Sequence, residues 1–555
     1  MTETDSDPTK GWSAIAPLRE RTFLMIWSAS LLSNFGQLIQ GVGAAWEMTR
    51  MTNAPEMVAL VQSAMMLPLV LISIPAGAVA DMFDRRKIAL LGLTFATLSA
   101  ATLTTLALLG YTTPWLLLAF CSLIGTGTAL YGPAWQASVV EQVKPVHLPA
   151  AVALGSISYN IARSFGPAVG GVIVLAFGAK AAFGINALFY LPLLGAFFLW
   201  RRKHVPPRLP PERIDRAIIS GARYAVHSPP IRIVMIRAFA AGLAGAATSA
   251  LTPLVARDLL KGDAGTFGLL LGFTGVGAVL GALLVSWVRE RFKAEQSVRW
   301  CSIFGGLMIV TIGLSRNLWL TGGALMGAGA SSMLLIALLN VGVQLSAPRW
   351  VTARALTWFQ SALTFGVGLG AWLWGHLAAN IGVGSAFIAS GITLLLTPLI
   401  GLLFPMPRVS MEDAEMVEIA HEPEVALAIT ALSGPINLEI DYRVDPAQAR
   451  DFYNVMLKLQ RSRLRNGGFD WSIARDIADP ALWTERYHCP TWGDYLRQRS
   501  RMTQSDRDLQ AQADAFITVG HGTRIRRRLE RPFGSVRWLA ETPDVKQAPI
   551  TIYTP

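Results

Sequence analysis

One charged side chain lies in the middle of a long apolar stretch, where it could bind an ion or a substrate. Arg163 falls about halfway along the run 150–177, and Ser156, Asn160, Arg163 and Pro167 follow the i, i+4, i+7, i+11 spacing of one helix face. An isolated charge at this depth of a bilayer costs at least ~2.5–3.5 kcal/mol on insertion scales. Arg163 is therefore predicted to line a cavity and to meet an anionic substrate or a proton-binding carboxylate. The alternative is an internal ion pair or a hydrogen bond between helices.

Uncharged polar side chains inside other apolar runs are further candidates for substrate contact. Each of them alone is more often a hydrogen bond between helices than a ligand contact, so they are predicted as a set. The predicted substrate-binding residues are Asn34, Gln37, Gln136, Asn160, Arg163, Asn340 and Gln360.

Carboxylates are scarce near these apolar runs. No Asp or Glu falls at mid-depth, and the nearest are Glu47, Asp81 and Glu141, which are the candidates to carry a proton. The sequence has no Gly-x-x-x-x-Gly-Lys-Ser/Thr phosphate loop, which disfavours ATP-driven chemistry. The three cysteines are scattered without a Cys-x-x-Cys pair, so they predict neither a disulfide framework nor a metal site. No cofactor is expected.

The elements that position these residues are apolar runs long enough to cross a bilayer. Of the 555 residues, 52% are hydrophobic and 15% charged, whereas soluble domains carry roughly 25% charged residues. A helix needs about 20 apolar residues to span the hydrocarbon core. The sequence therefore predicts an all-α membrane protein with twelve transmembrane helices. The predicted spans are Phe23–Met48, Met57–Ala80, Ile88–Gly110, Trp115–Val140, Ala150–Phe177, Ala182–Trp200, Ile233–Leu254, Thr266–Val288, Ser297–Leu314, Leu318–Leu345, Ala353–Ala378 and Gly384–Phe404.

Basic residues are unevenly divided between the loops. With the N-terminus inside, cytoplasmic segments carry roughly twenty Lys and Arg residues and the opposite side about five. The positive-inside rule therefore predicts a multi-pass protein of the inner, cytoplasmic membrane with both termini in the cytoplasm. This asymmetry accounts for much of the net charge of +12, and no nucleic-acid partner is expected. The polar N-terminal segment has no apolar core with a cleavage site, so no signal peptide is expected.

The break 201–232 divides the spans into two six-helix halves. Within it, Glu212–His227 has the pattern of an amphipathic helix. Lys144–Leu154 and Ala347–Leu356, about two hundred residues apart, resemble each other weakly, and such repeats are typical of secondary transporters with a midplane substrate site. The predicted segments are 1–22, 23–200 (N-terminal half), 201–232 (linker), 233–405 (C-terminal half), 406–433 (linker), 434–532 (soluble domain) and 533–555 (tail).

The loop after the second span carries Gly77, Asp81, Arg85 and Arg86. A glycine at this point permits close helix contact, Asp81 stands at the helix end, and the two arginines enter the headgroup zone. A simple positively charged turn would explain the arginines, but it would not explain the pairing of Gly77 with Asp81.

These four residues resemble the signature Gly-x-x-x-Asp-Arg-x-Gly-Arg-Arg of the major facilitator superfamily, from which Met82 and Asp84 depart. The form Asp84-Arg85-Arg86 is similar to the transmembrane secretion effectors, the branch that includes the enterobactin exporter. The resemblance implies that the loop latches the two halves in one access state. Met82 stands where the signature has Arg, which puts the strength of the latch in doubt.

The fifth span carries Gly166, Pro167, Gly170 and Gly171. Gly166 and Gly170 form a small-x-x-x-small surface for close helix packing, and Pro167 removes a backbone donor and invites a kink. The four residues resemble the Gly-Pro-x-x-Gly-Gly motif associated with antiporters of the superfamily. This resemblance implies export, with protons as the coupling ion.

Charges return at soluble density from Arg408 onward. The predicted elements are strands at Ile436–Val444, Phe469–Asp476, Trp483–His488 and Thr523–Leu529, and helices at Pro446–Arg465 and Trp492–Phe516. The order β-α-β-β-α-β gives an α+β ferredoxin-like fold. The domain resembles dimeric α/β-barrel domains related to antibiotic-biosynthesis monooxygenases, which implies a homodimer through it. Because His488 and His521 lack companions at a recognisable spacing, a regulatory or dimerising module is favoured over a catalytic one.

Together these features predict a secondary active transporter, rather than an enzyme, in the lipid bilayer. It is expected to export small amphiphilic molecules, siderophore-like or drug-like, by proton antiport with alternating access. The alternative is a membrane-anchored fusion whose C-terminal domain has monooxygenase-like or regulatory activity coupled to export.

Replacing the mid-span cation tests this interpretation. Arg163→Ala should abolish transport and leave membrane insertion intact, because the substitution removes the charge without lowering the hydropathy of the span. Transport in proteoliposomes and the amount of protein in the membrane fraction measure the two effects. Full activity of the variant would restrict Arg163 to a structural role.

Overall fold

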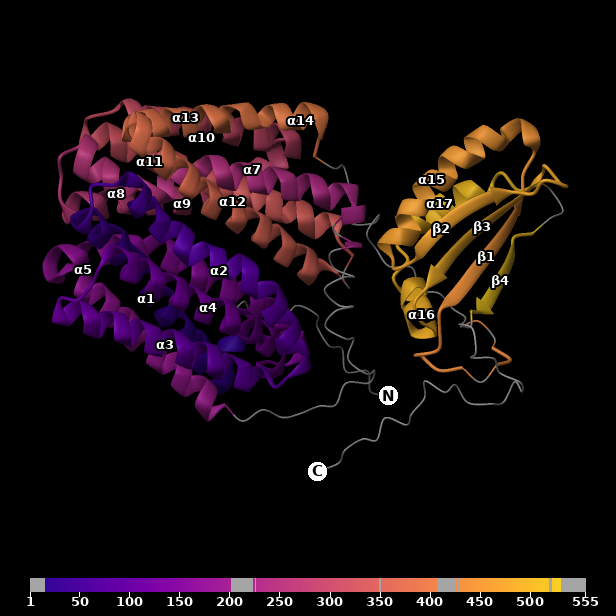
Figure 1. Ribbon diagram of the computed structural model, residues 1–555, viewed down its shortest axis with the longest axis horizontal. Coiled ribbons are helices and arrows are strands. Elements are labelled where there is room, and N and C mark those ends of the chain that lie inside the picture. The colour runs from indigo at the N-terminus through magenta and orange to yellow at the C-terminus, as the bar shows by residue number, and fades with distance from the viewer. Residues whose placement is uncertain are drawn as a thin grey trace, which may run out of the picture. The chain divides into compact units, whose positions relative to one another are not determined.

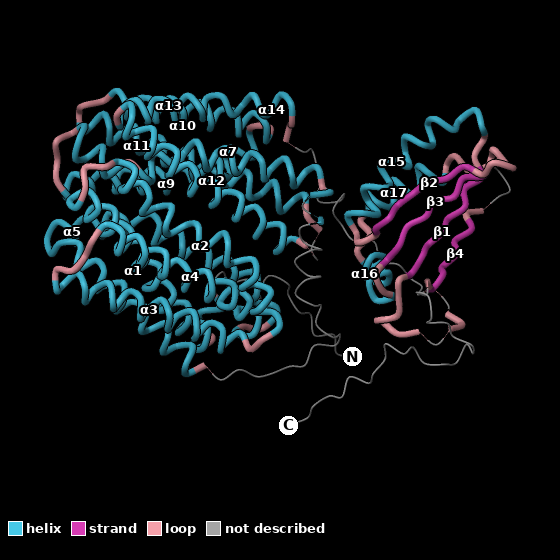
Figure 2. Tube along the Cα trace, in the orientation of Figure 1, coloured by secondary structure: helices cyan, strands magenta, loops and turns pink. Residues whose placement is uncertain are grey.

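A computed structural model of the chain describes residues 15–200, 223–348 apart from 225, 351–406, and 423–530 apart from 424, 428 and 519–521. At some positions inside helices, 77, 81 and 82 among them, only the backbone is described. Two compact units are formed. The first holds the described residues up to 200, Met235–Asn340 and Phe359–Met406, and the second holds those of 223–234, 341–358 and 423–530. Helices make up the first unit, and a sheet with helices on it dominates the second (Figures 1 and 2).

The N-terminal half of the first unit begins with a 3₁₀ turn followed by long helices. They are α1 (Arg21–Met51), α2 (Pro55–Met82), α3 (Arg85–Leu109), α4 (Pro114–Gln142) and α5 (Leu148–Leu199). Local chemistry sets several ends: Asp84 accepts a hydrogen bond from the Arg86 amide, Thr113 caps α4, and Gly110 ends α3 in the left-handed conformation. These signals allow short connections between antiparallel neighbours.

Helix α5 consists of two helical arms on either side of a kink, and together they cross the membrane twice. Its 52 residues would extend about 78 Å as a straight helix, far beyond the ~30 Å hydrocarbon core. Gly178 leaves helical geometry, with φ 79° and ψ 171°. Only glycine adopts this conformation readily, and it separates the fifth and sixth predicted spans.

The C-terminal half follows the same plan. It contains α7 (Pro229–Ala250), α8 (Thr252–Leu254), a π-helical turn (Val255–Leu259), α9 (Ala264–Arg291), α10 (Ala294–Leu314), α11 (Leu318–Ser346), α12 (Thr352–Ile381), α13 (Val383–Leu396) and α14 (Ile400–Leu403). The described chain has 11 helices long and apolar enough to cross a membrane. Counting both arms of α5, the twelve predicted crossings are confirmed.

The seventh span was predicted too short. The structure starts α7 at Pro229 instead of Ile233 and carries the span to Leu259 instead of Leu254. Proline suits the first turn of a helix, where the missing N–H has no partner to lose. Positions 212–222 of the predicted amphipathic helix Glu212–His227 lie outside the described residues.

Side-chain size separates the inside of the first unit from its surface. Buried positions are often small: Ala96, Ala100 and Ala246 are at most 1% exposed, whereas Leu71 and Leu283 are more than 70% exposed. In lipid no hydrophobic force drives helices together, so close packing of small residues takes that role. The exposed apolar side chains are those expected of a lipid-facing surface.

The second unit contains a four-stranded antiparallel sheet in the order β2-β3-β1-β4. Its elements are β1 (Ile436–Arg443), α15 (Ala449–Arg465), β2 (Phe469–Arg475), β3 (Leu482–Cys489), α16 (Trp492–Ser500), α17 (Gln504–Asp514) and β4 (Arg524–Leu529). Strand β1 turns Leu438, Ile440 and Tyr442 toward Phe452 and Met456 of α15 to form the core. The predicted ferredoxin-like fold is confirmed.

The single helix predicted at Trp492–Phe516 is wrong, because the structure has two helices there. α16 ends at Ser500, and Thr503 starts α17 through a capping box with Asp506. A Thr-x-x-Asp pair satisfies free N–H groups at a helix start, so it favours a new helix over continuation of the first.

Candidate functional site

Two ends of the helix bundle can be defined. At the Thr52 end, α1 passes into α2, and at the Asp84 end, α2 passes into α3. The two halves meet closely along α5 and α9. A methyl group at Gly171 would lie 2.1 Å from the Gly268 Cα, and one at Gly275 would lie 2.1 Å from the Ser164 carbonyl oxygen. Only glycine therefore fits at these positions.

Helices α2 and α12 form a second junction between the halves. The Ser63 hydroxyl donates to the Gly368 carbonyl at 2.7 Å. One to two turns further along α12, a methyl group at Gly375 would lie 2.4 Å from the Ala59 Cβ. A hydrogen bond and a close approach at a glycine thus fix the register of α2 against α12.

A third junction lies beside the loop that defines the Thr52 end. Arg257 donates to the carbonyl oxygens of Thr49 and Thr52 at 2.6 and 3.1 Å. Beside it, the Trp46 and Phe267 rings stack with centroids 5.8 Å apart. The last carbonyls of α1, which have no helical partner, are satisfied here by an arginine of the other half.

These contacts share one location. Among the described residues, the inter-half contacts above fall at 46–52 on α1, 59–63 on α2, 164–171 on α5, 268–275 on α9 and 368–375 on α12. In every one of these helices this is the part nearer the Thr52 end or close to the middle. These described contacts join the halves toward the Thr52 end.

The predicted substrate-binding residues occupy the complementary zone. Asn34 is on α1, Gln136 on α4, Asn160 and Arg163 on α5, Asn340 on α11 and Gln360 on α12, each in the part of its helix nearer the Asp84 end or at its middle. Gln37, near the middle of α1, donates to Thr128 at 2.7 Å.

Arg163 immediately precedes Ser164, whose carbonyl lies against Gly275 of α9. Its side chain is half-buried, and it forms no hydrogen bond or ion pair with another described residue. The guanidinium thus lies at mid-span, next to a close contact between the two halves.

A buried polar group in the N-terminal half was not predicted as a site. Gln40 of α1 accepts a hydrogen bond from Asn186 on the second arm of α5, and both are at most 1% exposed. Tyr131 and Tyr190 meet edge to face nearby, with centroids 6.4 Å apart. Gly36 permits this approach, since a methyl there would lie 2.9 Å from the Asn186 side-chain oxygen. Spacing along one helix could not reveal the group because its members come from three spans.

Arg85 and Arg86 of the loop predicted as a latch bind other helices of the N-terminal half. Arg85 binds Glu141 at 3.0 Å and the Ala137 carbonyl at 2.8 Å, which ties α3 to α4. Arg86 donates to the Phe197 and Phe198 carbonyls at 2.9 and 2.5 Å, which ties α3 to the end of α5.

The remaining residues predicted for latching or coupling lie on α1 and α2. Glu47 pairs with Arg50 one turn along α1 at 3.5 Å. Gly77 and Asp81 lie in the last turns of α2, and the Asp81 side chain is outside the described part of the chain.

The glycine motif of α5 packs on two partners. Methyl groups at Gly166 and Gly170 would lie 3.1 Å from Leu38 and Ile39 of α1, whereas Gly171 faces Gly268 of the other half. Pro167 lies inside the first arm of the helix, which leaves helical geometry at Gly178. The motif therefore sets both the packing inside the N-terminal half and its junction with the C-terminal half.

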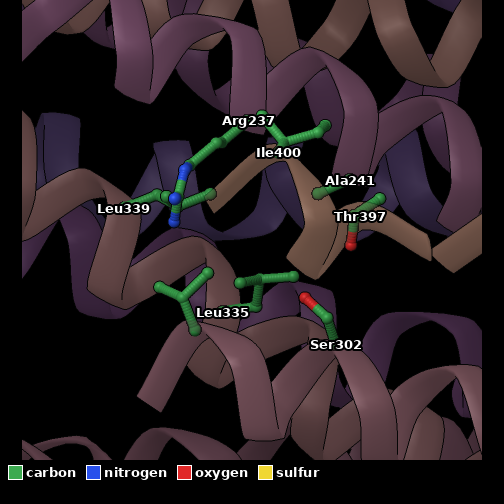
Figure 3. A pocket seen from close by; sticks show the side chains of 8 residues that line it. Arg237, Ala241, Ser302, Leu335, Leu339, Thr397 and Ile400 are labelled. Carbon is green, nitrogen blue, oxygen red and sulfur yellow. The ribbon is translucent and has the colours of Figure 1, made fainter. Parts of the chain in front are cut away.

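A second buried arginine in the C-terminal half was missed. Arg237 of α7 is 6% exposed, binds both Glu295 oxygens at 3.1 and 2.9 Å, and donates to the Phe404 carbonyl at 2.7 Å. It adjoins a cavity of about 10 Å³ lined by Ser302 and Thr397 among others (Figure 3). That space is near the minimum for one water molecule, so it is too small for a substrate. The sequence signal that could have revealed this arginine is its position as a charged residue inside the seventh predicted span.

Similarity to solved structures agrees with a transporter fold. A bacterial homologue of the human lysosomal transporter Spinster, in an inward-facing and unoccupied conformation, gives a TM-score of 0.56 at 14% identity over 70% of this chain and 96% of its own. A POT family transporter in complex with a thioalcohol conjugated peptide gives 0.55 at 14% identity over 69% and 96%. The fold is thus that of a multi-pass transporter with two six-helix halves.

The family follows from the sequence match. The family described as transmembrane secretion effector matches residues 12–533, and the chain belongs to it. The uncharacterized MFS-type transporter YfiS of Bacillus subtilis is 26% identical over 63% of this chain and 85% of its own length. The staphyloferrin A transporter of Staphylococcus aureus is 24% identical over 47% and 65%, and the multidrug efflux pump Tap of Mycolicibacterium fortuitum 23% over 69% and 96%.

Two glycines of α9 offer a matched test of the junction. Gly268→Ala should open the Thr52 end, because its methyl would lie 2.7 Å from the Gly171 Cα, whereas Gly272→Ala meets only an ordinary 3.7 Å contact. Spin labels at the exposed positions Asn53 and Lys261 report the separation of the halves by pulsed electron paramagnetic resonance. We expect longer distances in Gly268→Ala alone. Identical distributions in both variants would show that this contact does not hold the halves together.

The two mid-helix arginines should differ in their effect on stability. Arg237→Met should lower the thermal unfolding midpoint in detergent, because breaking a buried ion pair costs about 3–5 kcal/mol, and the 23% exposure of Glu295 places this pair at the low end. Arg163→Met should leave the midpoint near the wild-type value, since Arg163 forms no hydrogen bond or ion pair with another residue that the structure describes. Equal midpoints for both variants would contradict this assignment.

Proposed function

We propose that the protein is a secondary active exporter that moves small amphiphilic molecules out of the cytoplasm by alternating access and proton antiport. The observation that carries this proposal is the division of the first unit into two zones. Close inter-half contacts lie toward the Thr52 end, and the polar side chains lie toward the Asp84 end. A site at mid-depth between two halves, closed on one side, is what alternating access requires.

The charges of the helix ends favour a cytoplasmic Asp84 end. Arg85, Arg86 and Lys87 start α3 at this end, and Arg289 and Arg291 close α9 at the same end. By the positive-inside rule this end faces the cytoplasm. Substrate would then enter from the cytoplasm toward Arg163, as the loading step of an exporter requires.

Two features support the substrate class. Arg163 offers a half-buried cation at mid-span, which suits a molecule with an anionic group, and the surrounding helices are apolar. One relative is named a staphyloferrin A transporter and another a multidrug efflux pump, which supports a siderophore-like or a drug-like substrate. We therefore propose amphiphiles that combine an anionic head with an apolar body.

Glu141 is the proton carrier that the geometry favours, with Asp81 and Glu47 as the other candidates. Its carboxylate is 20% exposed and holds Arg85 across α3 and α4 at 3.0 Å. Protonation would cancel this ion pair and free α3 to shift against α4. The pair thus offers a charge change that is coupled to helix position.

Proteoliposomes test the coupling. With an anionic fluorescent amphiphile as the probe, an imposed pH gradient should drive accumulation, and Glu141→Gln should slow it at least tenfold because the proton has no carrier. Glu290→Gln, at an exposed position of α9 near the same end, is the matched control. Flux that is independent of the gradient would exclude antiport, and equal rates for the two variants would exclude Glu141 as the carrier.

A further inference from the structure

A cavity lies in the second unit. It has a volume of about 260 Å³ and is enclosed by strands β1 and β4 together with α15, α16 and α17. Figure 1 shows these helices lying on one face of the sheet. The volume falls just below the ~300–1,000 Å³ of typical ligand sites, so it suits a molecule of single-ring size.

Two arginines converge on one side of this cavity. Arg527 of β4 and Arg499 of α16 donate to the same Tyr495 hydroxyl at 2.7 and 3.3 Å. Both guanidinium carbons also lie near the Tyr495 ring, 5.8 and 6.0 Å from its centroid. Both guanidinium groups therefore place positive charge at this edge of the cavity, where it would attract an anionic group.

A buried hydrogen-bond donor, the Gln498 side-chain amide, also belongs to the cavity lining. Gln498, one turn after Tyr495, is 7% exposed and lines the cavity. Its Oε1 accepts from the Cys489 thiol at 3.2 Å, while its Nε2 has no hydrogen-bond partner. Buried polar groups are nearly always hydrogen-bonded, so an amide donor left open in a cavity wall indicates a ligand acceptor.

The acidic residues of the lining are already engaged. Asp506 accepts from Ser462 at 2.6 Å, from Asn466 at 3.0 Å and from Arg465. Burial opposes its ionisation, but the nearby Arg465 charge and these hydrogen bonds hold the pKa of Asp506 below its usual value. Asp514 accepts from Gln510 at 3.0 Å. These carboxylates line the α17 side and would keep an anion on the side of Arg499 and Arg527.

The sheet side of the cavity is largely apolar or aromatic, whereas the helix side also carries the polar residues Ser462, Asn466 and Gln510. Leu438 and Ile440 of β1 and Ile525 of β4 line the sheet side, and Tyr487 lies beneath Arg463 with 5.2 Å from its guanidinium carbon to the ring centroid. The charge of Arg463 is balanced by Glu485, which is fully buried, at 3.1 Å. The lining therefore combines an apolar floor with a cationic edge.

We infer that this cavity is a binding site for a small organic carboxylate with a planar apolar body, whose carboxylate is held by Arg499, Arg527 and the Gln498 amide. The site goes beyond the proposed export activity and does not rest on it. It gives the C-terminal domain a small-molecule ligand of its own.

Titration calorimetry on the full chain in detergent tests the site, with salicylate as the probe and salicylamide as its neutral isostere. We expect one saturable salicylate site and at least tenfold weaker binding of salicylamide. Arg527→Gln should weaken salicylate at least tenfold, and Arg527→Lys should restore part of the affinity. Arg524→Gln changes an exposed arginine on the same strand that lies outside the cavity lining, and it should bind as the wild type does.

Several results would overturn the inference. They are equal affinity for the acid and the amide, wild-type affinity in Arg527→Gln, or no saturable binding of salicylate. Loss of binding in Arg163→Ala would place the site in the membrane helices instead. Because export and salicylate binding are measured separately, failure of the proposed function leaves this test intact.

Discussion

The approach of backbone to backbone between α5 and α9 is the constraint on which the first unit depends. Gly171 and Gly268 leave no room for a side chain between them, and helices in lipid associate through such close packing instead of through the hydrophobic effect. This contact holds the halves together toward the Thr52 end. Arg163 lies one position from Ser164, which takes part in another close contact of this kind with Gly275.

The arginines of the first unit differ in the groups that they bind. Arg85, Arg86 and Arg237 satisfy carboxylates or carbonyls inside their own halves, so each half keeps its internal arrangement. Arg257 crosses to the other half, where it donates to carbonyls at the end of α1. Arginines thus stabilise both the packing within each half and the junction between the halves.

The sequence predicted the features that depend on neighbours along the chain. Apolar runs gave the spans and strand alternation gave the α+β domain, because both are local periodicities. Contacts between positions far apart in the sequence could not be predicted in this way. The pair Arg237–Glu295 joins residues 58 positions apart, and nothing local to either residue names the other. The break between α16 and α17 was missed although Thr503 and Asp506 form a recognisable cap, because the polar stretch around them read as one helix.

The connection between the two arms of α5 is a single residue, Gly178, which leaves helical geometry. One arm carries Gly171 at the inter-half contact, and the other carries the Phe197 carbonyl that holds Arg86. Because one residue spans only about 3.8 Å between neighbouring Cα atoms, the facing ends of the two arms cannot separate, and a displacement of one arm at this joint also displaces the other.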